Sequence, residues 1–430
     1  MKRKIGIGLF TFILCFFISY LLIMNLLPRS FSIIIGNESE LELQFPFSVN
    51  ASGQDSANIA INGQLLKQKL KLPSGPVKLE ATKVGRSSLQ FAIFGIPIKT
   101  ITVSVLPEIN VMPGGQAIGV LLRSKGVMIV GESYVEDNNG HRFFPSQEAG
   151  LNVGDKILEI NGDPIDDKIE LAAKIQKISA KGKKLNFLVK KKNGIIENIS
   201  LEAKENKNGI YMIGLYVDDG VAGVGTLTFY DPVHMEYGAL GHEIIEMNSQ
   251  SRIEVREGKI IEAQISGINS GQRGVPGEKL GTFFQTKNII GEISKNNQFG
   301  IYGKLLETPE NPYFNKAIPI ATINEVKKGA AKIYTVVKGG KIEEFNVNID
   351  RIYPQSAPSE KGMIVNITDP ALRKTTGGII QGMSGSPIVQ NGKLVGAITH
   401  VFVNDPAKGY GIFAEWMIQE TNFFQNIETR

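Results

Sequence analysis

Thiol chemistry is almost absent from this sequence. The 430 residues include one cysteine, Cys15, which lies in an apolar run near the N-terminus. This scarcity excludes an intramolecular disulfide framework, a cysteine-based zinc site and a catalytic cysteine. The zinc-binding pattern H-E-x-x-H does not occur either, which excludes a metalloprotease of that kind. We expect neither a metal nor an organic cofactor.

Charge of one sign is also scarce. The formal net charge is +5, and Lys and Arg alternate with Asp and Glu along most of the chain. The basic runs at 181–184 and 190–192 are short, and we expect them to be solvated strand ends and turns. We therefore predict that nucleic acid is not a partner.

The long hydrophobic run of the sequence lies at its N-terminus. Three basic residues at positions 2–4 precede residues 5–27, which carry no charge. As a helix, this run would span about 35 Å, enough to cross a bilayer core. It ends without the small residues that precede a cleavage site, so we predict an uncleaved transmembrane signal anchor over residues 1–28. The rest of the chain is then outside the cytoplasm. The alternative is a cleaved signal peptide.

Long helical patterns are few, whereas glycines number 47. Together with many Val, Ile and Thr residues, this composition predicts a mainly β fold with tight turns. Residues 29–104 contain five short alternating apolar runs separated by turn residues. We predict a small all-β module there, resembling a β-sandwich, with a spacer or partner-docking role.

Residues 105–202 differ from the segments on either side. Within them, residues 149–162 (AGLNVGDKILEING) resemble the signature of PDZ domains throughout. The pair Asn161 and Gly162 predicts a two-residue hairpin turn. A helix over 170–178 and a closing strand over 185–190 follow from the apolar pattern. We therefore predict an α+β PDZ domain over this range.

A PDZ domain binds an extended peptide as an added strand and holds its terminal carboxylate with backbone N–H groups. The short strand and loop that begin at residue 116 match this role in the PDZ pattern. The alternative is a PDZ domain that only packs against its neighbour and binds no free peptide. The residues predicted to bind the carboxylate are Gln116, Ala117, Ile118 and Gly119, and those predicted to line the side-chain pocket are Val120 and Leu122.

A candidate nucleophile lies in residues 382–387 (GMSGSP), which lead into an apolar strand. A nucleophilic serine must stand exposed on a tight turn, which the flanking glycines permit. Backbone N–H groups of Gly382 and Ser384 are the predicted oxyanion hole. We predict Ser384 as the nucleophile. Ser386 is the second candidate, and a Gly/Ser-rich turn without catalytic function is the alternative.

A serine nucleophile needs a general base, and the chain has only four histidines. His141 and His234 lie in polar stretches and are expected to be solvated. His242 follows an apolar stretch with small residues that would let its ring reach a cleft, so we predict it as the base. His400 follows the nucleophile on a strand, where it either lines the substrate cleft or is a hydrogen-bonded core histidine.

The acid that orients the histidine should lie between it and the serine, where the only aspartates are Asp350 and Asp369. Asp369 ends an apolar strand, whereas the arginine after Asp350 offers that carboxylate a local partner. We therefore predict Asp369 as the acid. The alternative is that Asp369 caps the turn before Pro370. Two glutamates are further candidates: Glu243 and Glu292.

The segments 239–242, 367–370 and 382–387 together resemble the stage IV sporulation protein B peptidases of endospore-forming bacteria, as do 225–230 and 399–406. The resemblance covers nearly the whole chain. It implies a chymotrypsin-like double β-barrel peptidase domain over residues 205–430 with a catalytic triad of His242, Asp369 and Ser384. One point fits poorly, because in chymotrypsin-like chains the acid lies in the first barrel, far before the serine.

The resemblance also implies a physiology. The chain would be a membrane-tethered serine endopeptidase that cleaves itself in trans and cleaves a membrane-bound regulatory protein during endospore formation. It would act in the space between the two membranes around the forespore. In a chymotrypsin-like specificity pocket, the residue at the bottom of the pocket lies about six residues before the serine. That position is the uncharged Gly378, which suggests small or apolar residues before the cleaved bond.

Overall fold

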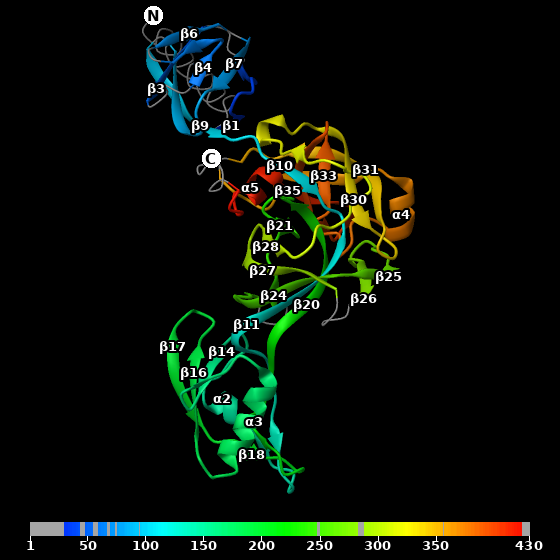
Figure 1. Ribbon diagram of the computed structural model, residues 1–430. Helices are drawn as coiled ribbons and strands as arrows, with labels where there is room; N and C mark the ends of the chain where they lie inside the picture. Colours follow the sequence, from blue (N-terminus) through cyan, green and yellow to red (C-terminus); the bar gives the residue numbers. More distant parts are fainter. Residues whose placement is uncertain are drawn as a thin grey trace, which may run out of the picture.

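The computed structural model describes residues 30–43, 48–54, 59–66, 69–73, 75–93, 95–246, 250–282, 288–355 and 357–423. They form three β-rich parts in a row, with the N-terminal module at one end and an α+β domain at the other (Figure 1). The predicted anchor over 1–28 lies outside the described residues. None of the helices within these ranges is long and apolar enough to cross a membrane.

The N-terminal module consists of two sheets that share one apolar core, which includes Ile33, Leu79 and Phe91. This arrangement agrees with the predicted small β-sandwich. Strands β1 and β9 pair in parallel, and the other pairs are antiparallel. One sheet has the order β1 (Ser30–Ile34), β9 (Ile96–Leu106), β8 (Gly85–Ile93), β3 (Val49–Gln54), β6 (Leu70–Leu72), and the other β2 (Ser39–Leu43), β7 (Gly75–Ala81), β4 (Ile59–Ile61), β5 (Gln64–Leu65).

The α+β domain contains the predicted PDZ signature. Asn161 and Gly162 have φ angles of 51° and 85°, which suit the predicted hairpin turn. The carboxylate of Asp167 caps the predicted helix by accepting from two backbone N–H groups. The elements are α2 (Pro145–Glu148), β14 (Lys156–Ile160), β15 (Asp163–Pro164), α3 (Lys168–Ser179), β16 (Leu185–Lys190), β17 (Ile196–Leu201) and the short pairs β12 (Val135–Glu136) with β13 (Arg142–Phe143) and β18 (Lys204–Glu205) with β19 (Tyr211–Met212).

Two long strands join the α+β domain to the middle of the molecule. β11 (Ala117–Glu132) and β20 (Leu215–Tyr230) each have 16 residues and pair with one another at both ends. The half of each strand that lies farther from the α+β domain belongs to a ring of six antiparallel strands. In this ring β11, β24, β27, β28, β21 and β20 pair in turn, and β20 closes on β11. The remaining strands of the ring are β21 (Glu236–Ala239), β24 (Val255–Glu262), β27 (Ile289–Asn297) and β28 (Gly300–Leu305).

A second set of six strands forms a closed barrel beside the first ring, in the order β30-β31-β32-β35-β34-β33. The two rings agree with the predicted double barrel. A short C-terminal helix follows this barrel and ends at Ile418. The elements are β30 (Gly329–Val336), β31 (Ile342–Ile352), β32 (Met363–Ile367), α4 (Pro370–Thr376), β33 (Pro387–Gln390), β34 (Lys393–Phe402), β35 (Asp405–Phe413) and α5 (Ala414–Ile418).

Smaller elements connect these parts. The hairpin of β25 (Gln264–Asn269) and β26 (Glu278–Thr282) projects from the first ring (Figure 1). The remaining short elements are β10 (Asn110–Pro113), β22 (Ile245–Glu246), β23 (Ser251–Arg252), β29 (Ile318–Pro319) and the 3-10 helix η1 (Ile323–Glu325).

The first ring is not confined to the predicted peptidase range of 205–430. Residues 118–123 of β11 pair with both β20 and β24, so the first ring begins before the PDZ signature and resumes after it. The PDZ part is therefore inserted between two strands of the first ring. Apolar alternation predicts a strand at 116–122 but not its partners.

This insertion overturns the predicted peptide-binding residues. Ile118, Val120 and Leu122 are buried in the apolar core of the first ring, together with Tyr237 and Ile260. Both edges of their strand are paired, so no peptide strand can add there. The corrected assignment as ring residues covers Gln116, Ala117, Ile118, Gly119, Val120 and Leu122.

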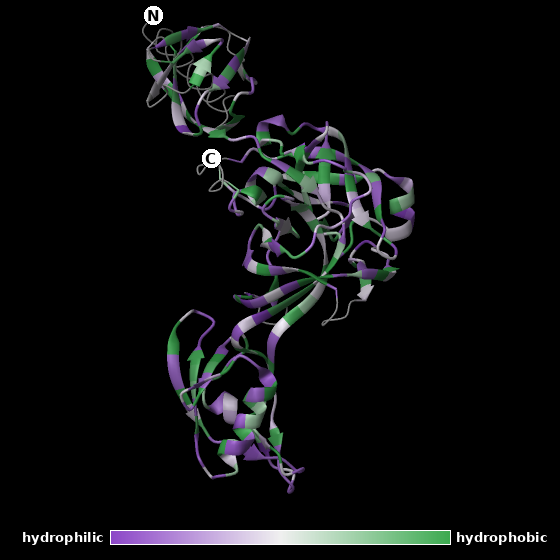
Figure 2. Cartoon of the chain, viewed as in Figure 1, coloured by the Kyte–Doolittle hydropathy of each residue, from purple (hydrophilic) through white to green (hydrophobic). Residues whose placement is uncertain are grey.

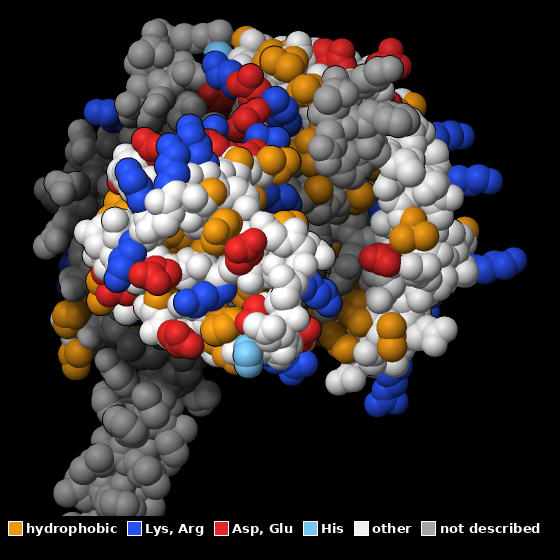
Figure 3. Space-filling model, turned by 90° about the horizontal axis from the view of Figure 1, so that it is seen from below, with side chains coloured by type: hydrophobic (Ala, Val, Ile, Leu, Met, Phe, Trp, Pro, Cys, Tyr) orange, Lys and Arg blue, Asp and Glu red, His pale blue; other side chains and the backbone are white. Residues whose placement is uncertain are grey.

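Hydrophobic and hydrophilic residues are interspersed along the strands of the molecule (Figure 2). The core of the second barrel contains Ile333, Val365, Leu372 and Ile398, all with no exposed area. On the face seen from below, Lys and Arg side chains lie interspersed with Asp and Glu (Figure 3). Such a mixture gives this face no electrostatic potential of one predominant sign.

Candidate active site

The nucleophile turn, defined here as residues 381–386, lies between α4 and β33. Gly385 has a φ of 92°, and a Cβ placed there would lie 2.1 Å from the carbonyl oxygen of Thr226. Only glycine allows this close approach. The turn leaves Ser384 half-buried, and its Oγ donates a hydrogen bond to the carbonyl oxygen of Thr399 at 2.6 Å.

The predicted oxyanion-hole donors are available in this turn. Within the described residues, the N–H groups of Gly382 and Ser384 donate to no protein acceptor. The carbonyl oxygen in each of these two peptide planes accepts a hydrogen bond. Gln381 O accepts from Lys279 N at 3.0 Å, and Met383 O accepts from the Ser386 backbone N–H at 2.9 Å and hydroxyl at 2.6 Å. Because C=O and N–H point in opposite directions in a trans peptide, these bonds also orient the two N–H groups.

His242 follows β21 by a sharp turn and lies beside the nucleophile turn. The preceding Gly241 packs against Thr399, whose Cγ2 lies 2.9 Å from the position of a Cβ added to the glycine. Thr399 is also the residue that accepts the hydrogen bond from Ser384. Thr399 thus contacts both the predicted nucleophile and the residue that precedes the predicted base.

The ring of His242 has a defined tautomer. Its Nδ1 lies 2.8 Å from the carbonyl oxygen of Glu243. Because a carbonyl only accepts, Nδ1 must carry the hydrogen, and Nε2 of the neutral ring is free to accept a proton. The backbone carbonyl of Glu243 therefore orients the imidazole ring of His242, a role that an acid usually has in a catalytic triad.

His242 is kept neutral near pH 7. Burial lowers the pKa of His242 below 6.5, although the bond to the Glu243 carbonyl and the charges of Glu360 and Glu243 oppose this effect. A neutral imidazole is the form that can act as a general base.

The pH dependence of serine reactivity follows from this shift. The rate at which a fluorophosphonate probe labels the chain should rise with pH and reach half its maximum below pH 6.5, because only the neutral ring accepts the serine proton. Glu360→Gln removes a negative charge that favours the protonated ring, so it should move the midpoint further down. Labelling rates measured from about pH 5 to about pH 8 test this. A midpoint above pH 7 would contradict the assignment.

His400 lies beside His242, with their ring centroids 4.9 Å apart. Although part of its side chain is exposed, loss of contact with water and the nearby charges of His242 and Lys361 lower the pKa of His400 to about 4. It is therefore neutral when His242 is neutral. Its position on β34 fits a residue that borders the substrate cleft rather than one buried in the core.

Asp369 does not orient His242 in this structure. Its carboxylate caps α4, accepting from the backbone N–H groups of Ala371 at 2.9 Å and Leu372 at 3.2 Å, and also from Asn346 N at 3.3 Å. The triad assignment of Asp369 is corrected accordingly, and the alternative of a cap before Pro370 describes what is seen. An aspartate before a proline satisfies either role, so the sequence pattern could not separate them.

A pair of variants separates the cap from a triad acid. Asparagine caps a helix about as well as aspartate, so Asp369→Asn should label with fluorophosphonate within about three-fold of wild type. Asp369→Ala should lower the free energy of unfolding by about 1 kcal/mol. A triad acid would instead lose about 10⁴-fold on change to asparagine. A loss of that size in a folded Asp369→Asn protein would restore the triad.

Gly378 has a packing role in place of the predicted pocket base. It is buried, and a Cβ placed there would lie 2.1 Å from the carbonyl oxygen of Pro406. The glycine therefore permits two backbone segments to touch, and the expectation of small or apolar substrate residues loses its basis. The other acid candidates are also occupied elsewhere: the carboxylate of Glu243 lies 3.9 Å from Arg252, and Glu292 lines a different pocket.

Sequence reasoning missed a buried lysine next to the nucleophile turn. Lys279 is 5% exposed, and its stem lies against Gly382. Its Nζ donates to the hydroxyl of the fully buried Thr335 at 2.7 Å. Burial lowers the pKa of Lys279 to about 7. A lysine in an otherwise polar hairpin gives no sequence signal of such burial.

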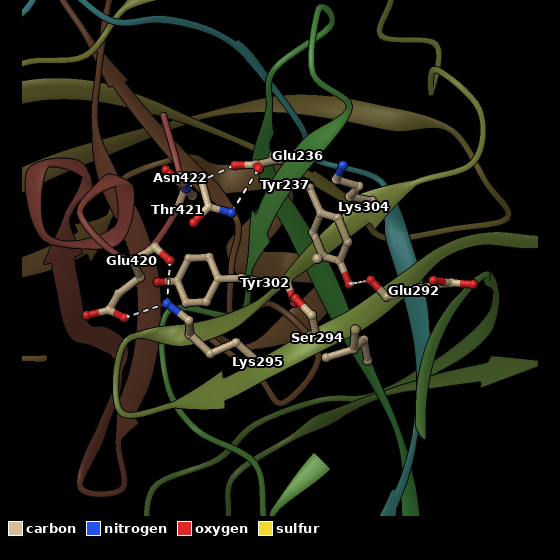
Figure 4. Close-up of a pocket in the computed structure, with 12 residues that line it drawn as sticks. Glu236, Tyr237, Glu292, Ser294, Lys295, Tyr302, Lys304, Glu420, Thr421 and Asn422 are labelled. Carbon is tan, nitrogen blue, oxygen red and sulfur yellow. Dashed lines mark hydrogen bonds and ion pairs between the residues drawn. The ribbon is translucent and has the colours of Figure 1, made fainter. Parts of the chain in front are cut away.

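A separate pocket of 260 Å³ lies on the outside of the first ring (Figure 4). Its lining does not include Ser384 or His242. There the segment after α5 is held to the ring, because Asn422 bonds to Glu236 and Lys295 bonds to Glu420 (Figure 4). The pocket marks a structural contact between the C-terminal segment and the first ring.

Comparisons with known proteins identify both functional domains. Residues 209–418 match the family model described as SpoIVB peptidase S55, and residues 140–191 match a PDZ domain. The first match contains His242 and Ser384. Together these findings define a serine peptidase that carries a PDZ domain. More particularly, the two matches support a SpoIVB-type, PDZ-containing serine peptidase.

Solved structures with some likeness include the Rv3671c protease from M. tuberculosis. Its active form is 12% identical, with a TM-score of 0.26, and the match covers 47% of this chain and 73% of that chain. Its inactive form is also 12% identical, with a TM-score of 0.25, 46% of this chain covered and 82% of that chain. Likeness of this size supports no conclusion about this chain.

Proposed function

We propose that this protein is a membrane-tethered serine endopeptidase that cleaves itself in trans and cleaves a membrane-bound regulatory protein during endospore formation. The match of residues 209–418 to SpoIVB peptidases carries this proposal, because that segment holds the candidate nucleophile and base. The charge-free run at 5–27 supports the tether and an extracytoplasmic location, between the forespore membranes.

In the proposed reaction, Ser384 first turns its hydroxyl from Thr399 O toward Nε2 of His242. Oγ attacks the peptide carbonyl carbon while its proton passes to Nε2, and the carbonyl oxygen takes up the electron pair facing Gly382 N–H and Ser384 N–H. The C–N bond then breaks, and the departing amine takes the proton from His242. A water molecule next gives its proton to His242 and attacks the acyl carbon. The bond between the acyl carbon and Oγ then breaks, Oγ takes the proton back from His242, and the acid leaves.

Peptide binding by the PDZ domain is proposed at a different strand from that predicted. Residues 215–218 of β20 pair with β11 along one edge, and α3 lies beside them through the Lys168–Asp218 ion pair at 2.9 Å. Exposed apolar side chains at Ile169, Met212 and Tyr216 surround this segment. A peptide that adds to β20 would find both a backbone edge and apolar contacts. Photo-crosslinking from position 216 to an apolar C-terminal peptide tests this location.

The proposed function is tested by cleavage in trans. A tagged full-length Ser384→Ala chain serves as substrate in membrane vesicles, with untagged wild-type chain as enzyme. We expect the tagged chain to be shortened only when wild type is added. A tagged chain that stays intact, although wild type still reacts with a fluorophosphonate, would reject self-cleavage while leaving the serine peptidase assignment in place.

A further inference from the structure

The backbone carbonyls of the nucleophile turn are all held by the protein. Each of the five carbonyl oxygens from residue 381 to residue 385 accepts a hydrogen bond. As described above, Lys279 holds the first and Ser386 holds the third. The other three bonds all come from strand β20, which belongs to the first ring, whereas the turn belongs to the second barrel.

The three bonds from β20 come from two threonines. The Thr226 hydroxyl donates to Gly382 O at 2.8 Å, the Thr226 backbone N–H donates to Ser384 O at 3.0 Å, and the Thr228 hydroxyl donates to Gly385 O at 2.8 Å. Both threonines have no exposed area. They are two residues apart on a strand, so their side chains point to the same face.

The hydroxyl groups of Thr226 and Thr228 are needed as hydrogen-bond donors at these two positions. Valine has nearly the same shape as threonine but cannot donate, so it would leave the carbonyls of Gly382 and Gly385 buried without a partner. The freed peptide planes could then rotate. Rotation about Gly382 is easy because glycine restricts its backbone little. The plane freed at Gly382 O lies between the two planes that carry the Gly382 and Ser384 N–H groups, so its rotation would disturb both. The plane freed at Gly385 O carries the Ser386 N–H, which donates to Met383 O and so orients the Ser384 N–H toward a substrate carbonyl.

We propose that Thr226 and Thr228 are positioning residues that hold the nucleophile turn in its reactive geometry from the opposite barrel. They act through the orientation of the Gly382 and Ser384 N–H groups and contact no reacting atom. Because β20 begins in the PDZ domain, the strand that supports the turn is also a strand of the PDZ domain. This inference needs only the serine peptidase assignment and does not depend on self-cleavage or on the sporulation role.

The test compares Thr226→Val, Thr228→Val and the corresponding serine variants in the full-length chain. Reaction with a fluorophosphonate probe gives kinact, which depends on the oxyanion hole, and KI, which reports binding. We expect kinact of each valine variant to fall about 10- to 100-fold, with KI within about three-fold of wild type. The serine variants, which keep the hydroxyl, should stay within about three-fold of wild type in both values.

A matched control separates positioning from simple loss of stability. Thr376 is also fully buried, and its hydroxyl bonds to Leu372 O at 2.9 Å, outside the turn. Thr376→Val should lower the unfolding temperature without changing kinact. Should a valine variant fail to fold, the alanine variant at that position is measured and the same split is expected. Unchanged kinact in folded valine or alanine variants, or serine variants as slow as valine variants, would overturn the proposal.

Discussion

Changing His242 to glutamine should slow the reaction of Ser384 with a fluorophosphonate by about 10³-fold or more. Removal of the general base costs this much in serine proteases, because the hydroxyl then has no acceptor for its proton. Glutamine keeps a polar side chain of similar reach but cannot take up a proton near neutral pH. The labelling rate of the purified full-length variant, compared with wild type at pH 7.5, measures the loss.

Two other histidines serve as controls for this variant. His234 lies in a turn and pairs with Asp231, and its side chain is 39% exposed. His234→Gln should therefore label within about two-fold of wild type, as surface changes usually have small effects. His400→Gln should have a smaller effect than His242→Gln. If the ranking of His242 and His400 were reversed, the base would be the other member of this neighbouring pair.

The second large effect is expected for Ser384→Ala, which should abolish cleavage of a tagged inactive chain and of any peptide substrate. Without Oγ no acyl intermediate can form, and only the slow residual rate of direct water attack is left. Ser386 is the alternative nucleophile, and its hydroxyl already donates to Met383 O. Ser386→Ala should reduce the rate through the loss of that bond but should leave measurable cleavage. Full activity of Ser384→Ala would remove this serine from the mechanism.

The sequence predicted the parts of the molecule that depend on local patterns. The PDZ signature at 149–162 folds as expected, since its hairpin turn and the helix that follows are encoded by adjacent residues. The choice of Ser384 as nucleophile and His242 as base also rests on local patterns, and it stays a prediction. Few histidines were available, and the turn at 382–387 has glycines on both sides of Ser384. In each of these cases the relevant neighbours are close in sequence.

Features that depend on distant partners could not be predicted. Alternation at 116–122 indicates a strand, but burial between β20 and β24 depends on residues about a hundred positions later. The bond from Thr226 to Gly382 spans 156 residues. The assignment of Asp369 as the triad acid does not fit the structure for a related reason. A helix cap and a triad acid look the same in sequence and differ only in which groups surround the carboxylate.

The arrangement of the two domains follows from β11 and β20. Each strand is long enough to belong to both the first ring and the PDZ domain. The chain therefore passes between the two domains as continuous strand at both points, without a flexible linker. A change at the PDZ end of β20 therefore lies on the same continuous strand as Thr226 and Thr228. This continuity gives the positioning residues a direct structural connection to the PDZ domain.

The most direct test of the account is to find where a serine-reactive probe attaches. The full-length wild-type chain is treated with a fluorophosphonate at pH 7.5, and its intact mass and peptide map are measured. The account predicts a single adduct, on the peptide that contains Ser384, and none in a Ser384→Ala chain treated in the same way. An adduct on another residue, or no adduct on the folded wild-type chain, would contradict the assignment of Ser384 and His242 as the catalytic pair.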